Sequence, residues 1–151
     1  MTIQFRRARS DDVASIVALL ADDVLGRQRE DVGSPLNPLY RAAFDAIDAD
    51  PNQLQLVALA GDELVGTLQL TFIPGLARQG AWRGQIEGVR IASAQRSSGL
   101  GQQMFQRAID ECRDRGCELV QLTTDIERPD AHRFYERLGF ENSHLGYKLK
   151  L

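Results

Sequence analysis

The spacing of apolar residues predicts one strand followed by two helices in the first third of the chain. Ile3–Phe5 alternates with polar residues, which is typical of a short strand. Apolar residues then recur at helical spacing in Val13–Val24 and again in Leu39–Ile47. Between these helices, residues 25–38 are charged and interrupted by glycine and proline, so a polar flap is expected there.

The middle of the chain is typical of antiparallel strands. Residues 54–60 form a nearly continuous apolar run, a Gly-Asp-Glu turn follows, and residues 64–72 alternate between apolar and polar. The next strand, 84–93, changes parity, because Ile86 belongs to the even set and Val89 to the odd set. A one-residue bulge at Glu87–Val89 would restore one apolar face, and such bulges redirect backbone groups beside active sites.

The pattern in the last third of the chain predicts a crossover connection followed by a terminal pair of strands. A helix beginning near Gly99 is followed by the buried strand 116–124, and a strand, helix and strand in this order indicate parallel pairing. Pro129 opens a short helix that Gly139 ends, and residues 140–151 are expected to form a terminal hairpin or pair of strands. The chain is therefore interpreted as one α/β domain, residues 1–151.

Composition narrows the class of partner. The net charge of −3 argues against nucleic acid, whose phosphates require a concentrated basic surface. No apolar run is long enough to span a membrane, so a cytoplasmic protein without a membrane partner is expected. Cys112 and Cys117 have neither disulfide nor metal spacing, so no metal is predicted and both are interpreted as packed apolar side chains.

The turn Gln95–Gly101 is the first candidate for chemistry. It leads into a helix, where free backbone N–H groups and the positive end of the helix dipole favour an anion such as a diphosphate. Gly99 and Gly101 lack a Cβ that would keep the diphosphate away from the backbone, and Arg96 adds a positive charge.

Two motifs in this part of the chain resemble a known family. Arg96-Ser97-Ser98-Gly99-Leu100-Gly101 matches the Arg/Gln-x-x-Gly-x-Gly/Ala signature of the GCN5-related N-acetyltransferase (GNAT) superfamily, and the segment 131–140 resembles its Ala-x-x-Phe-Tyr-x-x-x-Gly-Phe pattern. The resemblance implies a mixed central sheet of about six to seven strands with a splayed parallel pair, about four helices, and acetyl-coenzyme A as co-substrate. Arg128 stands where the family often has Asn.

The resemblance also implies which residues bind the coenzyme. Backbone amides after the bulge would hold the pantetheine arm and the thioester oxygen, and the turn would hold the diphosphate. The residues expected to bind the coenzyme are Val89, Arg90, Ile91, Gln95, Arg96, Ser97, Ser98, Gly99, Leu100, Gly101, Gln102, Asp125, Arg128, His132 and Phe134.

Glu87 and Tyr135 are the catalytic candidates. An amine attacks only when unprotonated, and a thiolate leaves more easily once protonated, so the reaction needs a base and an acid. Glu87 is an acid inside an apolar strand, where the family often places its base; the alternative is a structural ion pair with Arg90 or another arginine. Tyr135 occupies the family's tyrosine position facing the coenzyme sulfur; the alternative is packing beside Phe134.

The acceptor is less constrained by the sequence. Glu30 in the flap would suit a cationic amine, whereas Arg29 would suit a carboxylate or phosphonate. Trp82, between glycines, is a candidate lid residue with edge packing as the alternative, and His144 is a candidate to face the acceptor.

These observations favour an acetyl-coenzyme A-dependent transferase that acetylates a primary amine of a small molecule by direct attack. Two alternatives stay open: a protein or peptide acetyltransferase acting on a lysine or an N-terminus, and a non-catalytic acyl-coenzyme A sensor. A homodimer joined through the terminal strands is a further hypothesis.

Overall fold

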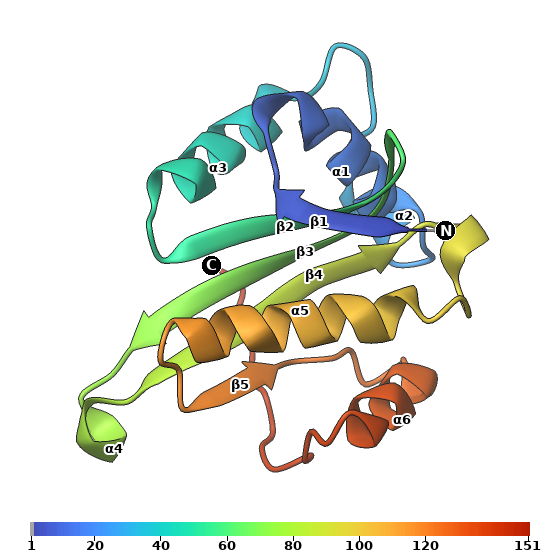
Figure 1. Cartoon of the computed structure of the whole chain (residues 1–151). Helices are drawn as coiled ribbons and strands as arrows, with labels where there is room; N and C mark the ends of the chain where they lie inside the picture. Colours follow the sequence, from blue (N-terminus) through green and yellow to red (C-terminus); the bar gives the residue numbers. More distant parts are fainter. Residues whose placement is uncertain (1) are drawn as a thin grey trace.

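The fold is a twisted five-stranded sheet with helices on both faces (Figure 1), described here for residues 2–151 of a computed structural model. None of the helices in this range is long and apolar enough to cross a bilayer. The elements in chain order are β1 (Ile3–Arg7), a 3-10 turn (Ser10–Asp12), α1 (Val13–Ala21), α2 (Gly26–Arg29), α3 (Pro38–Ala49), β2 (Gln53–Ala60), β3 (Glu63–Pro74), α4 (Ala77–Gly80), β4 (Trp82–Ile91), a 3-10 turn (Ser93–Gln95), α5 (Leu100–Asp114), β5 (Leu119–Leu122) and α6 (Pro129–Arg137).

The strands follow one another in sequence order across the sheet, β1-β2-β3-β4-β5. The first four pair antiparallel, and β4 pairs parallel with β5 through the crossover helix α5. The parallel pair is short, running from Arg83 opposite Leu119 to Ile86 opposite Leu122. The crossover and its parallel pairing confirm the sequence prediction.

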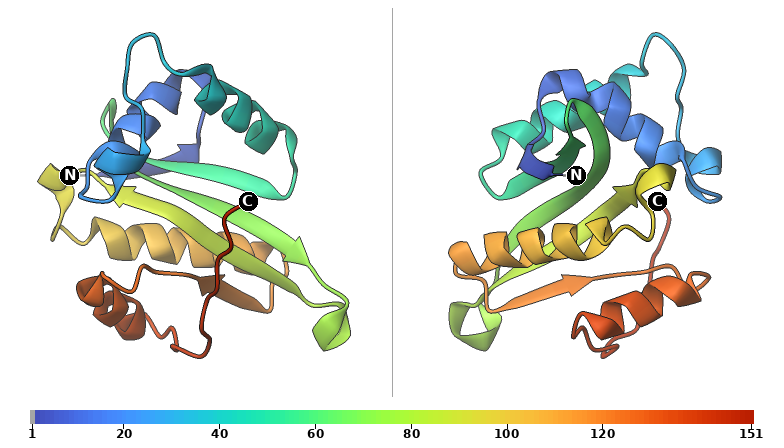
Figure 2. Two further views of the ribbon diagram at one scale, coloured as in Figure 1. Left: turned by 180° about the vertical axis from the view of Figure 1, so that it is seen from behind. Right: turned by 45° about the vertical axis from the view of Figure 1, so that its right-hand side comes forward.

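Two apolar clusters lie on opposite faces of the sheet. The larger joins Leu68, Leu70 and Ile86 of the strands to Met104 and Phe105 of α5, and α6 packs against the same cluster. The smaller lies under α1 and α3 (Figure 2). Burial of these apolar side chains is the main term that stabilises the fold.

The close approach of α5 to β4 depends on Gly84. A Cβ at this position would lie 2.3 Å from Sγ of the buried Cys112. No Cβ sits that close to another heavy atom, so glycine is required for the helix to pack at its present distance. This contact holds the end of α5 against the start of β4, at the opposite end of both elements from the bulge predicted at Glu87–Val89.

The C-terminal expectations were wrong. Residues 140–151 form no hairpin or strand, and the chain runs extended after α6 (Figure 2). The sheet of residues 2–151 therefore has five strands rather than six or seven, and this part of the chain has six α-helices rather than about four. The two additional helices are α2 and α4. Each is four residues long, which is too short to show a helical repeat of apolar residues in the sequence.

We expect Gly84→Ala to lower the free energy of unfolding by about 2 kcal/mol, because the added methyl group pushes Cys112 and α5 away from β4. Urea denaturation followed by the fluorescence of the single tryptophan, Trp82, measures this change. Gly75→Ala is the control, since the nearest atom to its Cβ lies 3.6 Å away.

The same clash predicts a coupling between two substitutions. Cys112→Ala removes the sulfur that the new methyl group meets, so the double variant should be more stable than the sum of the two single effects predicts. Strict additivity would contradict a direct contact between these positions.

Candidate functional site

A gap opens between β4 and β5 beyond the last paired residues, Ile86 and Leu122. The register of β3 with β4 moves from Gln69 opposite Glu87 to Thr67 opposite Arg90, so β4 carries one extra residue across from Leu68. Gly88 has φ +62°, which a residue with a Cβ adopts at a cost. This is the predicted bulge, and it turns the end of β4 away from β5.

Two backbone N–H groups of β4 point into this gap. Ala92 N–H donates to Val65 O of β3, and alternate residues of a strand direct their N–H groups to opposite sides. The N–H groups of Ile91 and Val89 therefore face away from β3, toward the side where β5 has already diverged. The sequence-predicted donors lie where a bound carbonyl oxygen could accept from them.

A second group of N–H donors lies at the start of α5. The first bond that closes a turn there runs from Gln103 N–H to Gly99 O, 3.2 Å. Among residues 2–151, the N–H groups of Gly99, Leu100, Gly101 and Gln102 donate to no protein acceptor. Unsatisfied donors at a helix N-terminus, together with the helix dipole, bind anions.

The two glycines and the arginine of this turn also have structural roles. Gly99 has φ +86° and lies at the helix cap, so its conformation requires glycine. A Cβ on Gly101 would lie 3.2 Å from Ile91 Cδ1 and 3.3 Å from Phe134 Cζ, so this glycine lets α5 begin close to β4 and α6. Arg96 donates to Asp22 O at 3.1 Å, which ties the turn to the end of α1.

Gln95 and Ser98 hold the turn in shape. Ser98 donates to Gln95 O from its backbone N–H, at 3.3 Å, and from its hydroxyl. Ser97 lies between them with φ +67°, an uncommon conformation for a residue with a side chain. The turn therefore presents main-chain groups outward.

Tyr135 lies on α6, on the same side of the sheet as α5. Its ring makes edge-on contacts with Phe105, Phe134 and Phe140, with centroids 5.4–6.2 Å apart. Burial raises the pKa of the Tyr135 phenol, while the positive charges of Arg128 and Arg90 act in the opposite direction. The phenol is therefore protonated at neutral pH and can donate a proton.

Glu87 lies on the opposite side of the sheet. It pairs with Gln69, whose neighbours Leu68 and Leu70 point toward α5, so Gln69 and Glu87 point away from that helix. The Glu87 side chain is exposed and forms no ion pair within residues 2–151. Arg90, its expected alternative partner, instead lies 3.2 Å from Asp23.

The gap is bordered by a group of charged residues, here called the arginine cluster: Arg29, Arg90, Arg128, Asp23, Glu30 and Asp125. Asp23 Oδ2 accepts from Arg128 at 2.9 Å and lies 3.2 Å from Arg90 Nε. Arg29 lies 3.8 Å from Asp125, and its side chain is 58% exposed, so it is the most accessible of the three arginines. The cluster joins the end of α1, the end of β4 and the start of α6.

Asp23 is the anchor of this cluster. Its other oxygen, Oδ1, accepts the Gly26 N–H at the start of α2. Burial acts to raise the pKa of the Asp23 carboxyl, but the Gly26 N–H, the Arg128 hydrogen bond and the charges of Arg90 and Arg128 hold it below its ordinary value. Asp23 is therefore a carboxylate that compensates two guanidinium groups.

The loop that carries Glu30 is fixed by α3. The Tyr40 hydroxyl donates to Glu30 at 2.9 Å and accepts from Asp31 N–H at 2.8 Å. Asn37, which caps α3, also donates to Asp31 at 3.2 Å. Part of the predicted flap is therefore an ordered segment, with α2 at its start.

Several residues predicted to bind the coenzyme make structural contacts near the gap. His132 Nε2 lies 3.1 Å from Asp125 O, so it steadies the loop after β5. Asp125 and Arg128, expected to contact the coenzyme, form ion pairs with Arg29 of α2 and with Asp23, which lies between α1 and α2. Phe134 packs against Gly101 and Phe105.

Trp82 and His144 are not brought to the site. Trp82 begins β4 opposite Pro74, five residues before Glu87, which places it about 16 Å away along the strand. His144 lies in the exposed C-terminal segment, where its only partner within the described chain is Ser143.

Asp23 is the site residue that sequence reasoning missed. It falls within the predicted helix Val13–Val24, whose apolar pattern assigns it no role, although an acid three residues before Gly26 suggests a helix cap with one oxygen left for another partner. Its partners Arg90 and Arg128 are distant in sequence, so no local pattern points to them.

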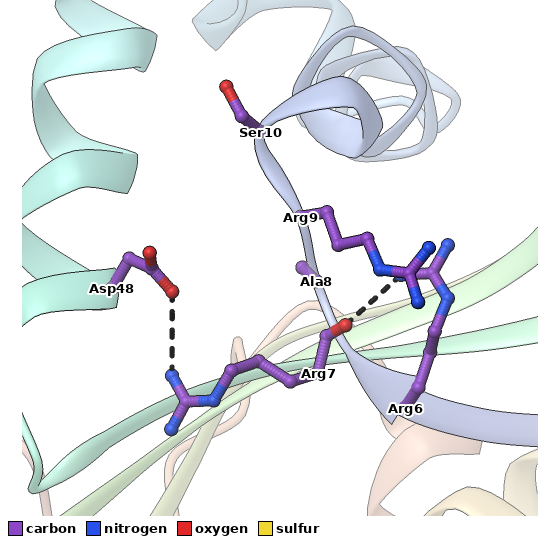
Figure 3. A pocket seen from close by; sticks show the side chains of 6 residues that line it. All are labelled: Arg6, Arg7, Ala8, Arg9, Ser10 and Asp48. Carbon is purple, nitrogen blue, oxygen red and sulfur yellow. Dashed lines mark hydrogen bonds and ion pairs between the residues drawn. The ribbon is translucent and has the colours of Figure 1, made fainter.

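A separate cavity of about 450 Å³ lies at the other edge of the sheet, between β1 and α3 (Figure 3). It is lined by arginines, but Arg6 is paired with Asp12 and Arg7 lies 3.8 Å from Asp48. This cavity contains neither the bulge nor the start of α5, so it is not part of the candidate site.

Comparison with known proteins defines the class. Residues 19–140 match the model of the acetyltransferase (GNAT) family. Over 144 residues the chain is 33% identical to the aminoalkylphosphonate N-acetyltransferase of Salmonella typhimurium, covering 95% of this chain and 88% of that one. The chain belongs to the GNAT family and is an acyltransferase.

Two solved structures are similar in fold and sequence. A crystal structure described as a transcriptional regulator from Bacillus halodurans C-125 superposes with a TM-score of 0.97 at 50% identity, over 99% of this chain and 100% of that one. A putative acetyltransferase from Agrobacterium tumefaciens superposes with a TM-score of 0.86 at 27% identity, over 98% and 99%.

We expect Asp23→Asn to destabilise the fold at neutral pH by about 2 kcal/mol, because Arg90 and Arg128 lose their counter-charge. The folded-state pKa of Asp23 lies below its unfolded value near 3.8, so its contribution is present above that pH and is lost as the pH falls through the folded-state pKa. The difference between wild type and variant should therefore shrink in acid.

Urea denaturation at a series of pH values tests this expectation. Asp22→Asn is the matched control, because its side chain is exposed and has no hydrogen-bond or ion-pair partner in the described chain. A difference for Asp23→Asn that is the same at low and neutral pH would contradict the ionic role.

Proposed function

We propose that the protein transfers the acetyl group of acetyl-coenzyme A to the primary amine of a small molecule that also carries an acidic group. The gap at the bulge of β4 is the observation that carries this proposal. Backbone donors face into it, and Tyr135 and Glu87 lie on opposite sides of the sheet beside it.

The residues around the gap fit the coenzyme. The free N–H groups at the start of α5 suit its diphosphate, and main-chain donors approach an anion closely where the turn presents no side chain toward it. The N–H groups of Val89 and Ile91 suit the thioester oxygen. When bound, acetyl-coenzyme A supplies an activated acetyl group, and the protein residues position it and move the protons.

The proton transfers are assigned to two side chains. Glu87 is exposed, unpaired within the described chain and on the side of the sheet away from α5, so it can accept the proton of the attacking amine directly or through a water. Tyr135 holds its proton because burial raises its pKa, and it donates that proton to the departing sulfur. The main-chain N–H groups of Val89 and Ile91 stabilise negative charge on the carbonyl oxygen.

Direct transfer to the amine is favoured over a covalent acetyl-enzyme. A cysteine nucleophile must be a thiolate, yet burial, with a smaller contribution from Cys117, raises the pKa of Cys112 to about 12. Cys117 is partly buried, and burial also raises its pKa. Neither thiol is activated, so amine and coenzyme are proposed to bind together.

The arginine cluster supports an acceptor with an acidic group. Three guanidinium groups lie near the gap, and the charges of Arg128 and Arg29 both reach Arg90. Arginine binds carboxylate, phosphate and phosphonate groups through paired hydrogen bonds. The Salmonella relative is named for acetylating aminoalkylphosphonates, and this chemistry fits a cluster in which the 58% exposed side chain of Arg29 is accessible to a ligand.

We expect Tyr135→Phe to lower kcat about 100-fold, because the departing sulfur loses its proton donor while the ring and its aromatic contacts stay. Coenzyme binding should be retained, so acetyl-coenzyme A should raise Tm equally in variant and wild type. Release of free coenzyme, with 2-aminoethylphosphonate as acceptor, measures kcat.

Tyr147→Phe is the matched control, because it removes the same hydroxyl from a tyrosine that is 91% exposed. Turnover unchanged in Tyr135→Phe would contradict its role as the acid. A wild-type Tm that does not respond to acetyl-coenzyme A would contradict the proposed function as a whole.

We expect Arg29→Gln to raise KM for 2-aminoethylphosphonate about 10-fold, with little change in kcat, because the charge contacts the acidic group and not the reacting atoms. KM for an uncharged amine of the same length should not change. Arg27→Gln in the same helix is the control, since Arg27 is exposed and forms no ion pair within the described chain.

The proposed specificity is contradicted if Arg29→Gln affects charged and uncharged amines equally. In that case the transferase assignment would stand and only the acceptor class would be withdrawn.

A further inference from the structure

The end of α5 brings the two cysteines of the chain together. Gly116 has φ +79° and donates its N–H to Arg113 O at 3.0 Å, while Cys117 N–H donates to Cys112 O at 2.9 Å. These two bonds define a Schellman motif, a helix ending in which a left-handed glycine turns the chain away from the helix. The motif commonly places in contact the side chains of the two positions that Cys112 and Cys117 occupy.

The separation of the two cysteines suits a disulfide. Because Cys117 N lies 2.9 Å from Cys112 O, standard bond lengths hold the two Cα atoms within about 6.8 Å of one another. Disulfides span Cα separations of about 4.4–6.8 Å. Both side chains pack in the larger apolar cluster, so they lie on the same side of the chain. Residues five apart share no helix face, which is why the spacing in the sequence did not indicate this pair.

The two thiols differ in their access to solvent. Cys112 is 1% exposed, and its Sγ packs against Gly84 of β4. Cys117 is only partly buried. A dissolved reagent therefore reaches Cys117 first, and Cys112 reacts only with a group already attached to Cys117.

A positive charge lies beside the two thiols. Burial raises the pKa of the Cys117 thiol, and the Cys112 thiol and the charge of Arg115 act in the opposite direction. Arg115 is held in place, because its guanidinium lies 4.1 Å from the centre of the Phe72 ring and donates to Pro51 O at 2.6 Å. A neighbouring cation favours the thiolate, which is the form of cysteine that attacks a disulfide.

We propose that Cys112 and Cys117 form a reversible redox site, at which a small disulfide such as glutathione disulfide oxidises the pair to an intrachain disulfide. The Cys117 thiolate attacks one sulfur of the small disulfide, and a mixed disulfide forms as one small thiol leaves. The Cys112 sulfur then attacks Cys117 and releases the second small thiol. Two electrons pass from the cysteine sulfurs to the small disulfide, and the two cysteine protons pass to the two released thiols.

The new bond ties the end of α5 to the chain just before β5. Directly after Cys117, Glu118 N–H donates to Trp82 O of β4, so the bond fixes the corner at which the crossover helix joins the sheet. The other ends of the same two elements, the start of α5 and the end of β5, border the gap. A disulfide lowers the conformational entropy of the unfolded chain, so the oxidised form is expected to be the more stable one.

The first test treats the full chain with glutathione disulfide, alkylates the remaining thiols in denaturant and measures the intact mass. The wild type should lose two hydrogen atoms and take up no alkyl group, because its only two cysteines are joined to each other. After digestion with trypsin, residues 108–113 and the peptide that begins at Gly116 should be one linked species, which dithiothreitol separates. Two alkylated thiols in the treated wild type, or a covalent dimer of two chains, overturns the proposal.

Two single variants test the order of the steps, with circular dichroism to show that each is folded. In Cys112→Ala the second thiol is missing, so Cys117 should retain glutathione as a stable mixed disulfide that the wild type does not accumulate. In Cys117→Ala the remaining thiol is buried, so the folded protein should take up much less glutathione. Equal uptake by the two variants, or glutathione retained by the wild type, overturns the proposal.

The third test measures Tm before and after oxidation. Glutathione disulfide should raise Tm of the wild type, and dithiothreitol should return it to the starting value. Cys117→Ala, treated in the same way, should show no rise. A wild-type Tm that is unchanged or lower after oxidation overturns the proposed tie between α5 and β5.

Discussion

The site depends on one interruption in the hydrogen bonding of the sheet. Gly88 takes a left-handed conformation that adds a residue to β4, and from that point β4 no longer pairs with β5. A sheet normally satisfies every N–H group with a neighbouring strand, so an unpaired stretch is costly unless another group accepts the bonds. Here the unpaired N–H groups of Val89 and Ile91 are the ones available to a substrate oxygen.

The bulge could be predicted from the sequence, because a change of apolar parity within one strand has few other physical causes. The parallel crossover and the start of α5 were also visible in local spacing. Asp23 was not, since it joins Arg128, 105 residues away in sequence, through contacts that no local pattern records. The prediction of a terminal hairpin or pair of strands at residues 140–151 was wrong for a different reason: a strand forms only beside a neighbouring strand, and the sequence of this segment does not show whether the chain supplies one.

Aromatic packing holds one side of the gap, and ion pairs hold the other. On the side of α5, apolar and aromatic contacts hold Tyr135, and its pKa rises because water is excluded. On the other side, Asp23 holds Arg90 and Arg128 while Glu87 stays exposed. The proposed acid, Tyr135, therefore lies in an apolar environment, and the arginines lie in a polar one. The two sides of the gap differ in chemical character.

The two hydrogen bonds of the Tyr40 hydroxyl have a consequence for the evolution of the family. Its single hydroxyl holds the loop after α2 through two bonds, from a helix that packs on the sheet independently of β4 and α5. Insertions or substitutions between residues 31 and 37 can therefore reshape this loop without disturbing the strand and helix that we propose hold the coenzyme. A lineage could exchange one amine for another through this loop while its catalytic frame stays constant.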